Sequence, residues 1–337
     1  MSGLNVEHIW HKFGDRMLLR DIALKLQAGE CCCLLGKSDS GKSTLLSQLK
    51  ARCEKEHLDV CLTAAPFALP RGTVEDALRR ALHMKGADAA LTEGRLCRLL
   101  DAFDLNPVRH LSCRDLSATR QECLAVALAV ASRPAVLLLD GMHSLNALLP
   151  ALRPIALESG MTVLCATQDV HSALRHADTV ALLHDGRILQ HDTPQQVFAH
   201  PATLDAAQLL YPCAVIPGTV KGVREKDSRC MLDANGLEIE CPCPDGTETG
   251  DRMTLLIPCR CLHLSRHPLP FGQNAAGKVT DVHFAFDEEA ITLLLPGGTS
   301  VTALRRTEKS GKTEIGDRLF LCWDMQSCHL YPDAPVV

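Results

Sequence analysis

The first 210 residues alternate between short apolar runs and longer stretches in which apolar residues recur every three or four positions. Nearly unbroken apolar runs at 31–35, 135–139 and 161–166 are typical of strands buried on both faces. The recurring pattern, clear at 45–49, is typical of helices with one buried face. Strands that alternate with helices in this way predict a parallel sheet covered by helices, which is an α/β fold.

The same pattern predicts further elements, each bounded by Gly, Pro or Asp turn signals. They are two strands within 4–30 with a turn at Gly14–Asp15, a helix to about Lys55, a strand at 60–62, helices within 73–104 broken near Gly86 and Thr92, a helix from Gln121 to Ser132, a helix over 170–177 and a hairpin over 179–189 that turns at Asp185–Gly186.

The pattern changes near Tyr211–Pro212. Beyond that point helical periodicity is almost absent, and short alternating runs such as 253–257 and 319–323 are separated by Pro and Gly turns. We therefore expect two domains, an α/β domain over 1–210 and a small all-β domain, in the form of a barrel, over 211–337.

One loop carries a chemical motif. Gly36–Thr44 is a complete G-x-x-x-x-G-K-[ST] match, entered from an apolar strand and followed by a helix. Backbone N–H groups of such a loop, the positive end of the helix and Lys42 all favour a phosphate, and Ser43 is placed to ligate Mg²⁺. The flanking strand and helix argue against a chance match. The predicted ligand residues are Gly36, Lys37, Ser38, Asp39, Ser40, Gly41, Lys42, Ser43 and Thr44.

Two further residues are candidates for the same nucleotide site. Asp140 ends a buried apolar run, so it carries a carboxylate to the sheet edge where nucleotide-bound Mg²⁺ would sit. Phe13 lies just before the first turn, where an aromatic ring either stacks on adenine or is an ordinary half-buried strand residue. The residues alone leave both readings of Phe13 open.

Composition and charge exclude several classes of protein. The 337 residues carry a formal net charge of -5, and the basic residues are scattered, which argues against a nucleic-acid partner. No apolar stretch approaches the roughly 18 residues of a membrane span, and the first 14 residues lack a signal-peptide pattern. We expect a cytoplasmic protein of about two domains.

The 17 cysteines require a choice between disulfides, metal ligands and packing. Cys31–Cys33 lie on a predicted buried strand, so we interpret them as reduced thiols that pack as small apolar groups. Cys241–Cys243 and Cys259–Cys261 are C-x-C pairs with His263 nearby. Their spacing differs from the C-x₂-C of common zinc sites, so we assign no metal ligand there.

The order of these motifs resembles the ATP-binding subunit of ABC transporters over nearly the whole chain. The matching segments are Gly36–Thr44 with Walker A, Val136–Asp140 with Walker B, Leu116–Arg120 with a worn LSGGQ signature, Ala166–Asp169 with the switch-histidine region, and 177–188 and 192–198 with the end of the ATPase domain. The last domain, with 316–324 and His329, is similar to the TOBE-like β-barrel of polyamine, iron, phosphonate and sugar importers.

The resemblance implies a set of expectations. The cofactors are ATP and Mg²⁺, the latter held by Ser43 and Asp140; Phe13 stacks on adenine; 73–115 is a helical subdomain; and 211–337 is regulatory. Two ATP-binding subunits close head to tail, so that Ser117 reaches the partner's nucleotide; the residues alone also allow Ser117 to be a simple helix N-cap. The other partners are permease membrane subunits and, indirectly, a periplasmic binding protein, with this chain on the cytoplasmic face of the inner (plasma) membrane.

The chain also departs from the family pattern. The changes are Gly141 for the glutamate after Walker B, Gln168 for the switch histidine, Ala64 for the Mg²⁺-sensing glutamine, Asp39 for a small residue, and Ala118, Thr119 and Arg120 in the signature. General acid–base help is worth about 10²–10⁴ in rate. No catalytic residue is intact, whereas the phosphate loop is, so we predict Mg·ATP binding with weak hydrolysis.

Two functions remain open on the sequence. In the first, the chain energises an importer by nucleotide-driven dimer closure. In the second, it is a non-catalytic ATP-binding sensor or regulator derived from such a subunit, which Ala64 at the permease-coupling position favours. Whether the dimer pairs two identical chains or two different ones, neither arrangement yields a complete hydrolytic site.

Overall fold

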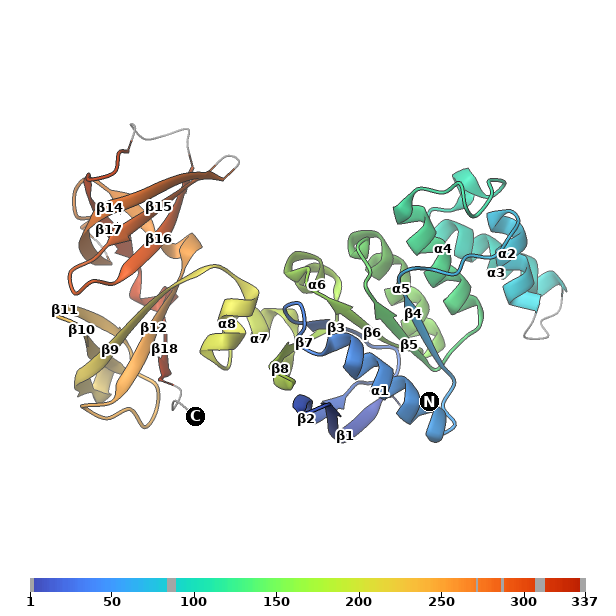
Figure 1. The fold of residues 1–337 in the computed structure, drawn as a ribbon, viewed down its shortest axis with the longest axis horizontal. Coiled ribbons are helices and arrows are strands. Elements are labelled where there is room, and N and C mark those ends of the chain that lie inside the picture. Colours follow the sequence, from blue (N-terminus) through green and yellow to red (C-terminus); the bar gives the residue numbers. More distant parts are fainter. Residues whose placement is uncertain (1–2, 84–88, 271, 286–287, 307–312, 334–337) are drawn as a thin grey trace. The chain divides into compact units, whose positions relative to one another are not determined.

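The computed structural model divides the chain into two compact units, Met1–Leu209 and Leu210–Val337. Figure 1 shows an α/β unit and an all-β unit. The described residues are 3–83, 89–270, 272–285, 288–306 and 313–333.

The first unit holds one parallel sheet, its helices and a separate hairpin. Its elements are β1 (Asn5–Phe13), β2 (Arg16–Lys25), β3 (Cys31–Leu35), α1 (Lys42–Lys55), β4 (Val60–Ala64), α2 (Val74–His83), α3 (Ala89–Ala102), α4 (Ala118–Ala131), β5 (Val136–Asp140), α5 (Leu145–Ser159), β6 (Thr162–Thr167), α6 (Val170–His176), β7 (Thr179–His184), β8 (Arg187–Asp192), α7 (Pro194–Ala199) and α8 (Leu204–Leu210).

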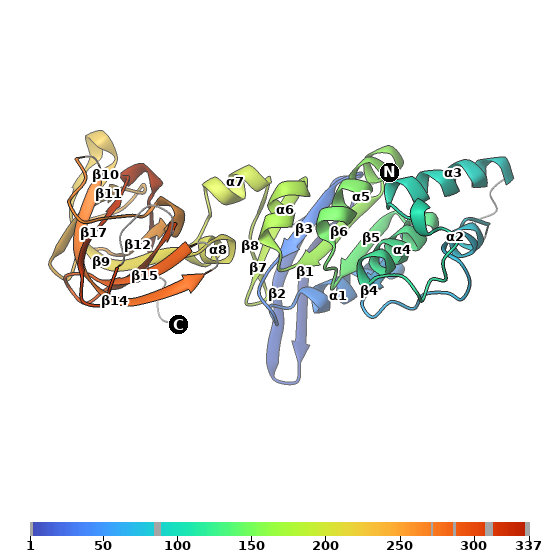
Figure 2. The same cartoon turned by 90° about the horizontal axis from the view of Figure 1, so that it is seen from above.

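The main sheet has the order β4-β5-β6-β3-β7-β8, and every neighbouring pair is parallel except β7 with β8. All five residues of β3 are buried, as an apolar run covered on both faces requires. Helix α1 lies on one side of this sheet, and α5 and α6 lie on the other (Figure 2). The predicted α/β fold is confirmed.

Helix α1 and the N-terminal hairpin share one core with the sheet. Leu45, Leu46 and Leu49 of α1 are fully buried against apolar residues of β1, β2, β3 and β5. The turn between β1 and β2 uses Gly14 with φ 57°, a conformation that glycine adopts without strain. This packing fixes the start of α1, and with it the loop that precedes it.

Some predicted elements differ from the structure. The break expected near Thr92 is wrong, because Thr92 lies inside α3 and is 1% exposed; Gly86 lies outside the described residues. Helix α4 begins at Ala118, three residues before the predicted start at Gln121. Helix α5 was not predicted, since Pro150 and Pro154 within it disguise the helical pattern.

The second unit consists of two antiparallel sheets. Its strands are β9 (Cys213–Arg224), β10 (Arg229–Ala234), β11 (Leu237–Pro242), β12 (Arg252–Pro258), β13 (His263–Ser265), β14 (Gln273–Ala285), β15 (Glu288–Leu294), β16 (Ser300–Arg306), β17 (Arg318–Trp323) and β18 (His329–Pro332). They pair in the orders β11-β10-β9-β12-β18 and β13-β17-β14-β15-β16.

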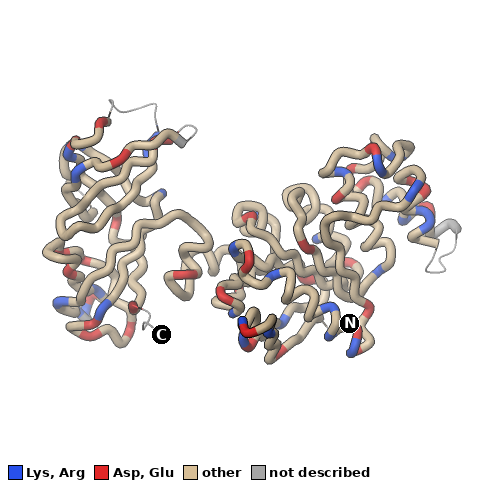
Figure 3. Tube along the Cα trace, viewed as in Figure 1, with Lys and Arg blue, Asp and Glu red and all other residues tan. Residues whose placement is uncertain are grey.

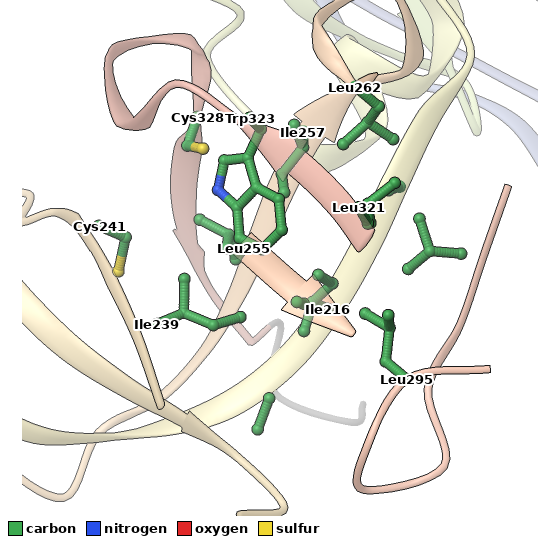
Figure 4. Close-up of a cluster of buried hydrophobic side chains, with 14 of the residues drawn as sticks. Ile216, Ile239, Cys241, Leu255, Ile257, Leu262, Leu295, Leu321, Trp323 and Cys328 are labelled. Carbon is green, nitrogen blue, oxygen red and sulfur yellow. The ribbon is translucent and has the colours of Figure 1, made fainter. Parts of the chain in front are cut away.

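One apolar core lies between the strands of these two sheets. It takes Ile216 and Leu255 from the first sheet and Leu321 and Trp323 from the second. Figure 4 shows Leu255 and Ile257 beside the Trp323 ring. The expected small all-β domain is therefore present, built as two five-stranded sheets around a shared core.

Charges of both signs are interspersed along the trace of each unit (Figure 3). Lys221, for example, lies 3.1 Å from Asp233 and 3.4 Å from Glu238. Among the described helices, none is long and apolar enough to cross a membrane.

Candidate nucleotide-binding site

The loop between β3 and α1 has a backbone that requires glycine at both ends. A Cβ on Gly36 would lie 2.6 Å from both the Leu183 carbonyl oxygen and Ser40 Oγ, closer than atoms can pack. Gly41 has φ 99°, in the region that side chains other than glycine's rarely adopt. The loop is thus held in a tight turn against β7 immediately before α1.

The side chain of Lys42 is held over this loop by carbonyl groups of the loop. Its Nζ donates to the Gly36 oxygen at 2.7 Å and to the Lys37 oxygen at 2.6 Å. Burial lowers the pKa of Lys42, while the carboxylates of Asp140 and Asp39 oppose that shift. The ammonium is therefore fixed beside the loop, with two carboxylates near enough to favour its charged form.

The N-terminus of α1 points its unpaired N–H groups at the same loop. Gly41 is the N-cap, and within the described chain no side chain caps this end by a hydrogen bond. The first turn also lacks acidic residues, so no carboxylate within that turn offsets the positive end of the helix dipole. This is the local chemistry that binds a phosphate.

A pocket of about 890 Å³ opens over this helix end. It is formed where the carboxyl ends of β5 and β6 meet the loop, because Leu35 of β3 pairs with Thr167 of β6 and β5 pairs with β6. The lining residues are Arg16, Leu18, Ser38, Asp39, Gly41, Lys42, Ser43, Thr44, Asp140, Gly141, Met142, His143, Ala166, Thr167, Gln168 and Asp169.

The metal candidates Ser43 and Asp140 both line this pocket. Asp140 is half-buried at the end of β5, opposite Ala64 of β4. A hydroxyl and a carboxylate oxygen are the hard ligands that Mg²⁺ prefers, and the ion keeps several waters and phosphate oxygens as its remaining ligands. The residues present therefore fit a nucleotide-bound Mg²⁺.

A buried carboxylate holds the turn after Asp140 by accepting hydrogen bonds from its backbone. Glu122 of α4 is 5% exposed, and its Oε2 accepts from the Ser144 N–H at 2.8 Å. The His143 N–H lies 3.2 Å from both Glu122 oxygens. Glu122 thereby fixes the turn that carries Gly141, Met142 and His143 into the pocket.

Gly141 and Gln168 both face the pocket. Gly141 supplies no side chain, and its φ is 68°. Gln168 Nε2 donates to Ser38 Oγ at 3.2 Å, which ties the end of β6 to the phosphate loop. An amide in this place binds hydrogen-bond partners but does not take up or release a proton near neutral pH.

Asp169 next to Gln168 begins α6 as its N-cap. Its carboxylate accepts from the Ser172 N–H at 3.0 Å. Burial disfavours the charged carboxylate, but hydrogen bonds from Ser172 and His171 outweigh it, so the pKa of Asp169 is lowered. The charge of Asp169 therefore stabilises the N-terminus of α6. Asp140, the half-buried carboxylate at the end of β5, has no such capping role among the described helices.

Five predicted ligand residues do not line the pocket: Gly36, Lys37 and Ser40 of the loop itself, and Phe13 and Ser117, which lie outside the loop. Phe13 is 75% exposed at the end of β1. Ser117 is the N-cap of α4, although its side chain makes no capping hydrogen bond to the described residues. Arg120, in the worn signature, lies 3.5 Å from Asp104 of the same chain.

Sequence reasoning missed several lining residues. Arg16 and Leu18 come from β2, which no motif connects to the phosphate loop, and Met142 and His143 follow the Walker B segment. Glu122 was also missed, although a lone carboxylate in an apolar helix such as 122–131 is a usable signal of a buried polar partner.

The second C-x-C pair does not gather into a metal site. Cys259 Sγ donates to the Thr302 carbonyl oxygen at 3.3 Å, and His263 lies on β13. Within the part of the chain that the structure describes, no group of three or more His, Cys, Asp or Glu residues is arranged to hold a metal ion.

Comparison with known proteins places the first unit in one family. The ABC transporter family model matches residues 19–143. The Fe(3+) ions import ATP-binding protein FbpC of Streptomyces avermitilis is 32% identical over 235 residues, which are 63% of this chain and 68% of that protein.

Two other relatives match nearly end to end. The spermidine/putrescine import ATP-binding protein PotA of Nitrosomonas europaea is 26% identical, over 97% of this chain and 98% of that protein. The putrescine transport ATP-binding protein PotG of Escherichia coli is 26% identical, over 96% of this chain and 94% of that protein.

Solved structures agree on the fold. The protein cbiO1 of Clostridium perfringens, part of the ABC transporter complex cbiONQ, superposes with a TM-score of 0.51 at 20% identity, over 59% of this chain and 91% of that one. An ATP-binding subunit of an ABC transporter superposes with a TM-score of 0.50 at 20% identity, over 61% and 97%. The chain therefore belongs to the family of ABC transporter ATP-binding proteins.

Proposed function

We propose that this chain binds Mg·ATP in the pocket over α1 and hydrolyses it weakly. The observation that carries the proposal is the combination of an intact phosphate loop with a pocket that lacks a carboxylate at Gly141 and a histidine at Gln168. Lys42, the N–H groups of α1 and Asp140 act on the bound ground state, so binding does not depend on the missing groups.

Each part of the nucleotide has proposed contacts. The loop Gly36–Thr44 holds the phosphates, with Lys37, Ser38, Asp39 and Ser40 at its rim. Ser43 and Asp140 hold Mg²⁺, which neutralises charge on the phosphate oxygens when it is bound. Phe13, exposed beside the turn of β1, provides an aromatic face for adenine.

We further propose that the chain is the ATP-binding subunit of an importer. The relatives PotA, PotG and FbpC are import or transport ATP-binding proteins for polyamines or iron, which supports this role. The partners would be permease subunits in the inner (plasma) membrane, a second ATP-binding subunit whose nucleotide Ser117 meets on closure, and indirectly a periplasmic binding protein. The chain would then work on the cytoplasmic face, with 211–337 as its regulatory TOBE-like domain.

A second function, a non-catalytic ATP-dependent sensor, is favoured by one observation. Ala64 ends β4 directly opposite Asp140, so the position from which the family senses Mg²⁺ and couples to the permease carries only a methyl group. Affinity capture from membranes separates the two functions. Recovery of a permease with the chain supports the importer subunit, whereas recovery of soluble partners alone supports the sensor.

Equilibrium binding of Mg·ATP to the full chain tests the nucleotide site itself. Lys42→Ala should abolish binding, because it removes the charge fixed over the loop. Lys50→Ala is the matched control: Lys50 lies on the same helix and pairs with Glu54 at 2.7 Å. Equal binding by Lys42→Ala and Lys50→Ala would show that the phosphate loop is not the site.

A further inference from the structure

The C-x-C pair Cys241–Cys243 has a third thiol opposite it. Strands β10 and β11 pair with Cys230 opposite Cys241, and the two Sγ atoms are 3.5 Å apart. Cys230 is 2% exposed and Cys241 is 0% exposed, and both belong to the core of the second unit. Figure 4 draws Cys241 among the side chains of this core.

The backbone spacing suits a bond between these sulfurs. The Cys243 N–H donates to the Ser228 carbonyl oxygen at 2.9 Å, so by alternation along the ladder Cys230 and Cys241 form the next hydrogen-bonded pair. Residues opposite each other in such a pair have Cα atoms about 5.5 Å apart, which lies within the range that disulfides span. Opposite Cβ atoms in a sheet lie about 4.5–5.5 Å apart and a disulfide spans about 3.5–4.5 Å, so closing the bond takes rotation of both side chains together with a small approach of β10 and β11.

We propose that Cys230 and Cys241 form a reversible disulfide and that this pair is a redox modification site for low-molecular-weight disulfides such as oxidised glutathione. The S–S bond of the oxidant breaks as the Cys230–Cys241 bond forms. The two cysteines give up two protons and two electrons, and two glutathione thiols leave. The reverse exchange with glutathione restores both cysteines.

Burial decides where the exchange begins. Burial raises the pKa of Cys230, and the neighbouring Cys241 raises it further. Burial also raises the pKa of Cys241 to about 11. Thiols in this state are poor nucleophiles. Cys243 is half-buried and lies two residues beyond Cys241, on the same face of the strand. Cys243 is therefore the thiol that first attacks the oxidant, and exchange with Cys230 and then Cys241 passes the bond inward.

The other use of clustered thiols is metal binding. In the described residues no group of three His, Cys, Asp or Glu side chains is arranged for a metal ion. A disulfide needs two sulfurs alone, which is what the Cys230–Cys241 pair offers.

The test is oxidation of the full native chain with oxidised glutathione, followed by alkylation under denaturing conditions and non-reducing peptide mapping. The expected product is a peptide pair joined through Cys230 and Cys241, lighter by two hydrogen atoms and separated by reductant. Cys97 is exposed and serves as the internal control for oxidant, because it should carry glutathione instead. The link should also raise the unfolding temperature of the second unit by about 5 °C.

Cysteine variants show which sulfurs form the link and which one begins the exchange. Cys230→Ala should abolish the link, Cys243→Ser should slow its formation about tenfold, and Cys97→Ser should leave it unchanged. Recovery of alkylated Cys230 and Cys241 from chains whose Cys97 is fully glutathionylated would overturn the proposal. So would a final product in which either residue is linked to another cysteine, since the Cys230–Cys243 link of the proposed route is only transient. Both outcomes are read on the unaltered chain, so a misfolded variant does not remove the test, and neither readout requires nucleotide.

Discussion

In the proposed function, single residues in the pocket separate binding from turnover. Lys42 is fixed by two carbonyl oxygens of its own loop, and the N-terminus of α1 is uncapped by any described side chain. Gly141 offers no proton acceptor, and Gln168 is engaged with Ser38. The first group of residues would stabilise a bound phosphate, whereas the second lacks the groups that would assist attack by water.

Gly141 is also constrained by its backbone, which gives a stability prediction. Its φ of 68° is strained for other residues, while the nearest atom to an added Cβ, that of Ala65, is at an ordinary 3.6 Å. Gly141→Ala should therefore lower the free energy of unfolding of the first unit by about 1 kcal/mol through the backbone alone. Urea titration measures it.

The matched control has the opposite sign. Gly94 lies within α3, and an added Cβ there meets no atom within 4 Å. Gly94→Ala should raise the free energy of unfolding by about 0.5–1 kcal/mol, because alanine favours the helix. Equal effects of the two substitutions would contradict the left-handed turn at 141.

Glu122 provides a second prediction at the pocket. Glu122→Ala leaves the N–H groups of His143 and Ser144 without their acceptor, which costs about 1–3 kcal/mol. We expect lower stability and weaker Mg·ATP binding, since the released turn lines the pocket. Calorimetry would measure both. Glu158→Ala, at an exposed pair with Arg98, should change neither.

Among secondary structure elements, those with a strong local pattern were predictable. The phosphate loop, β3, α1 and the β7–β8 hairpin follow from motifs and apolar runs. Helix α5 does not, because proline has a very low helix propensity and the helix contains two prolines. Burial of Leu148 and Leu152 nevertheless stabilises this helix. Likewise Thr92 is tolerated in α3 because packing overrides a weak local preference.

The residues of the candidate site also divide into those that a local pattern predicts and those that tertiary contacts place. Asp140 and the loop residues could be found from spacing, since a strand and a helix fix them directly. The places of Arg16 and Leu18 in the pocket, and the hydrogen bonds from the 143–144 backbone to Glu122, depend on contacts between segments far apart in sequence. No local pattern encodes such contacts.

Helix α2 is anchored by an ion-pair cluster whose pH dependence is testable. Glu75 lies 2.9 Å from Arg109 Nε and 3.0 Å from Arg79. Hydrogen bonds from Arg109 and then Arg79 lower the pKa of Glu75 to about 2. Because the folded-state pKa lies below the ordinary 4.5, this stabilisation is complete above about pH 4.5 and is lost as the pH falls toward 2.

Unfolding temperatures at pH 5 and pH 3 measure this contribution. Glu75→Gln should lose less stability than the unaltered chain over that interval, because its side chain has no charge to lose. Glu7→Gln, at an exposed carboxylate on β1, is the control. The cluster would be irrelevant to α2 if both variants followed the unaltered chain.

The whole molecule combines two units that have separate cores. Each contains one of the two tryptophans: Trp10 is 55% exposed on β1, and Trp323 is 3% exposed in the second core. A Trp10→Phe chain therefore reports the second unit alone by fluorescence. At [Mg·ATP] of about 100 Kd, binding stabilises the first unit by about 2.7 kcal/mol.

We expect Mg·ATP to raise the unfolding temperature of the α/β unit. Circular dichroism of its helices measures this temperature. The Trp323 transition should stay in place. A shift of the Trp323 transition equal to that of the helices would show that the two units unfold as one.

Steady-state hydrolysis of saturating Mg·ATP by the purified chain tests the central claim most directly. The account predicts measurable nucleotide binding with turnover no higher than that of Lys42→Ala, because Gly141 and Gln168 supply neither base nor proton switch. Turnover well above that of Lys42→Ala would contradict the account, and the chain would then be an ordinary transport ATPase whose catalytic groups lie elsewhere in the pocket.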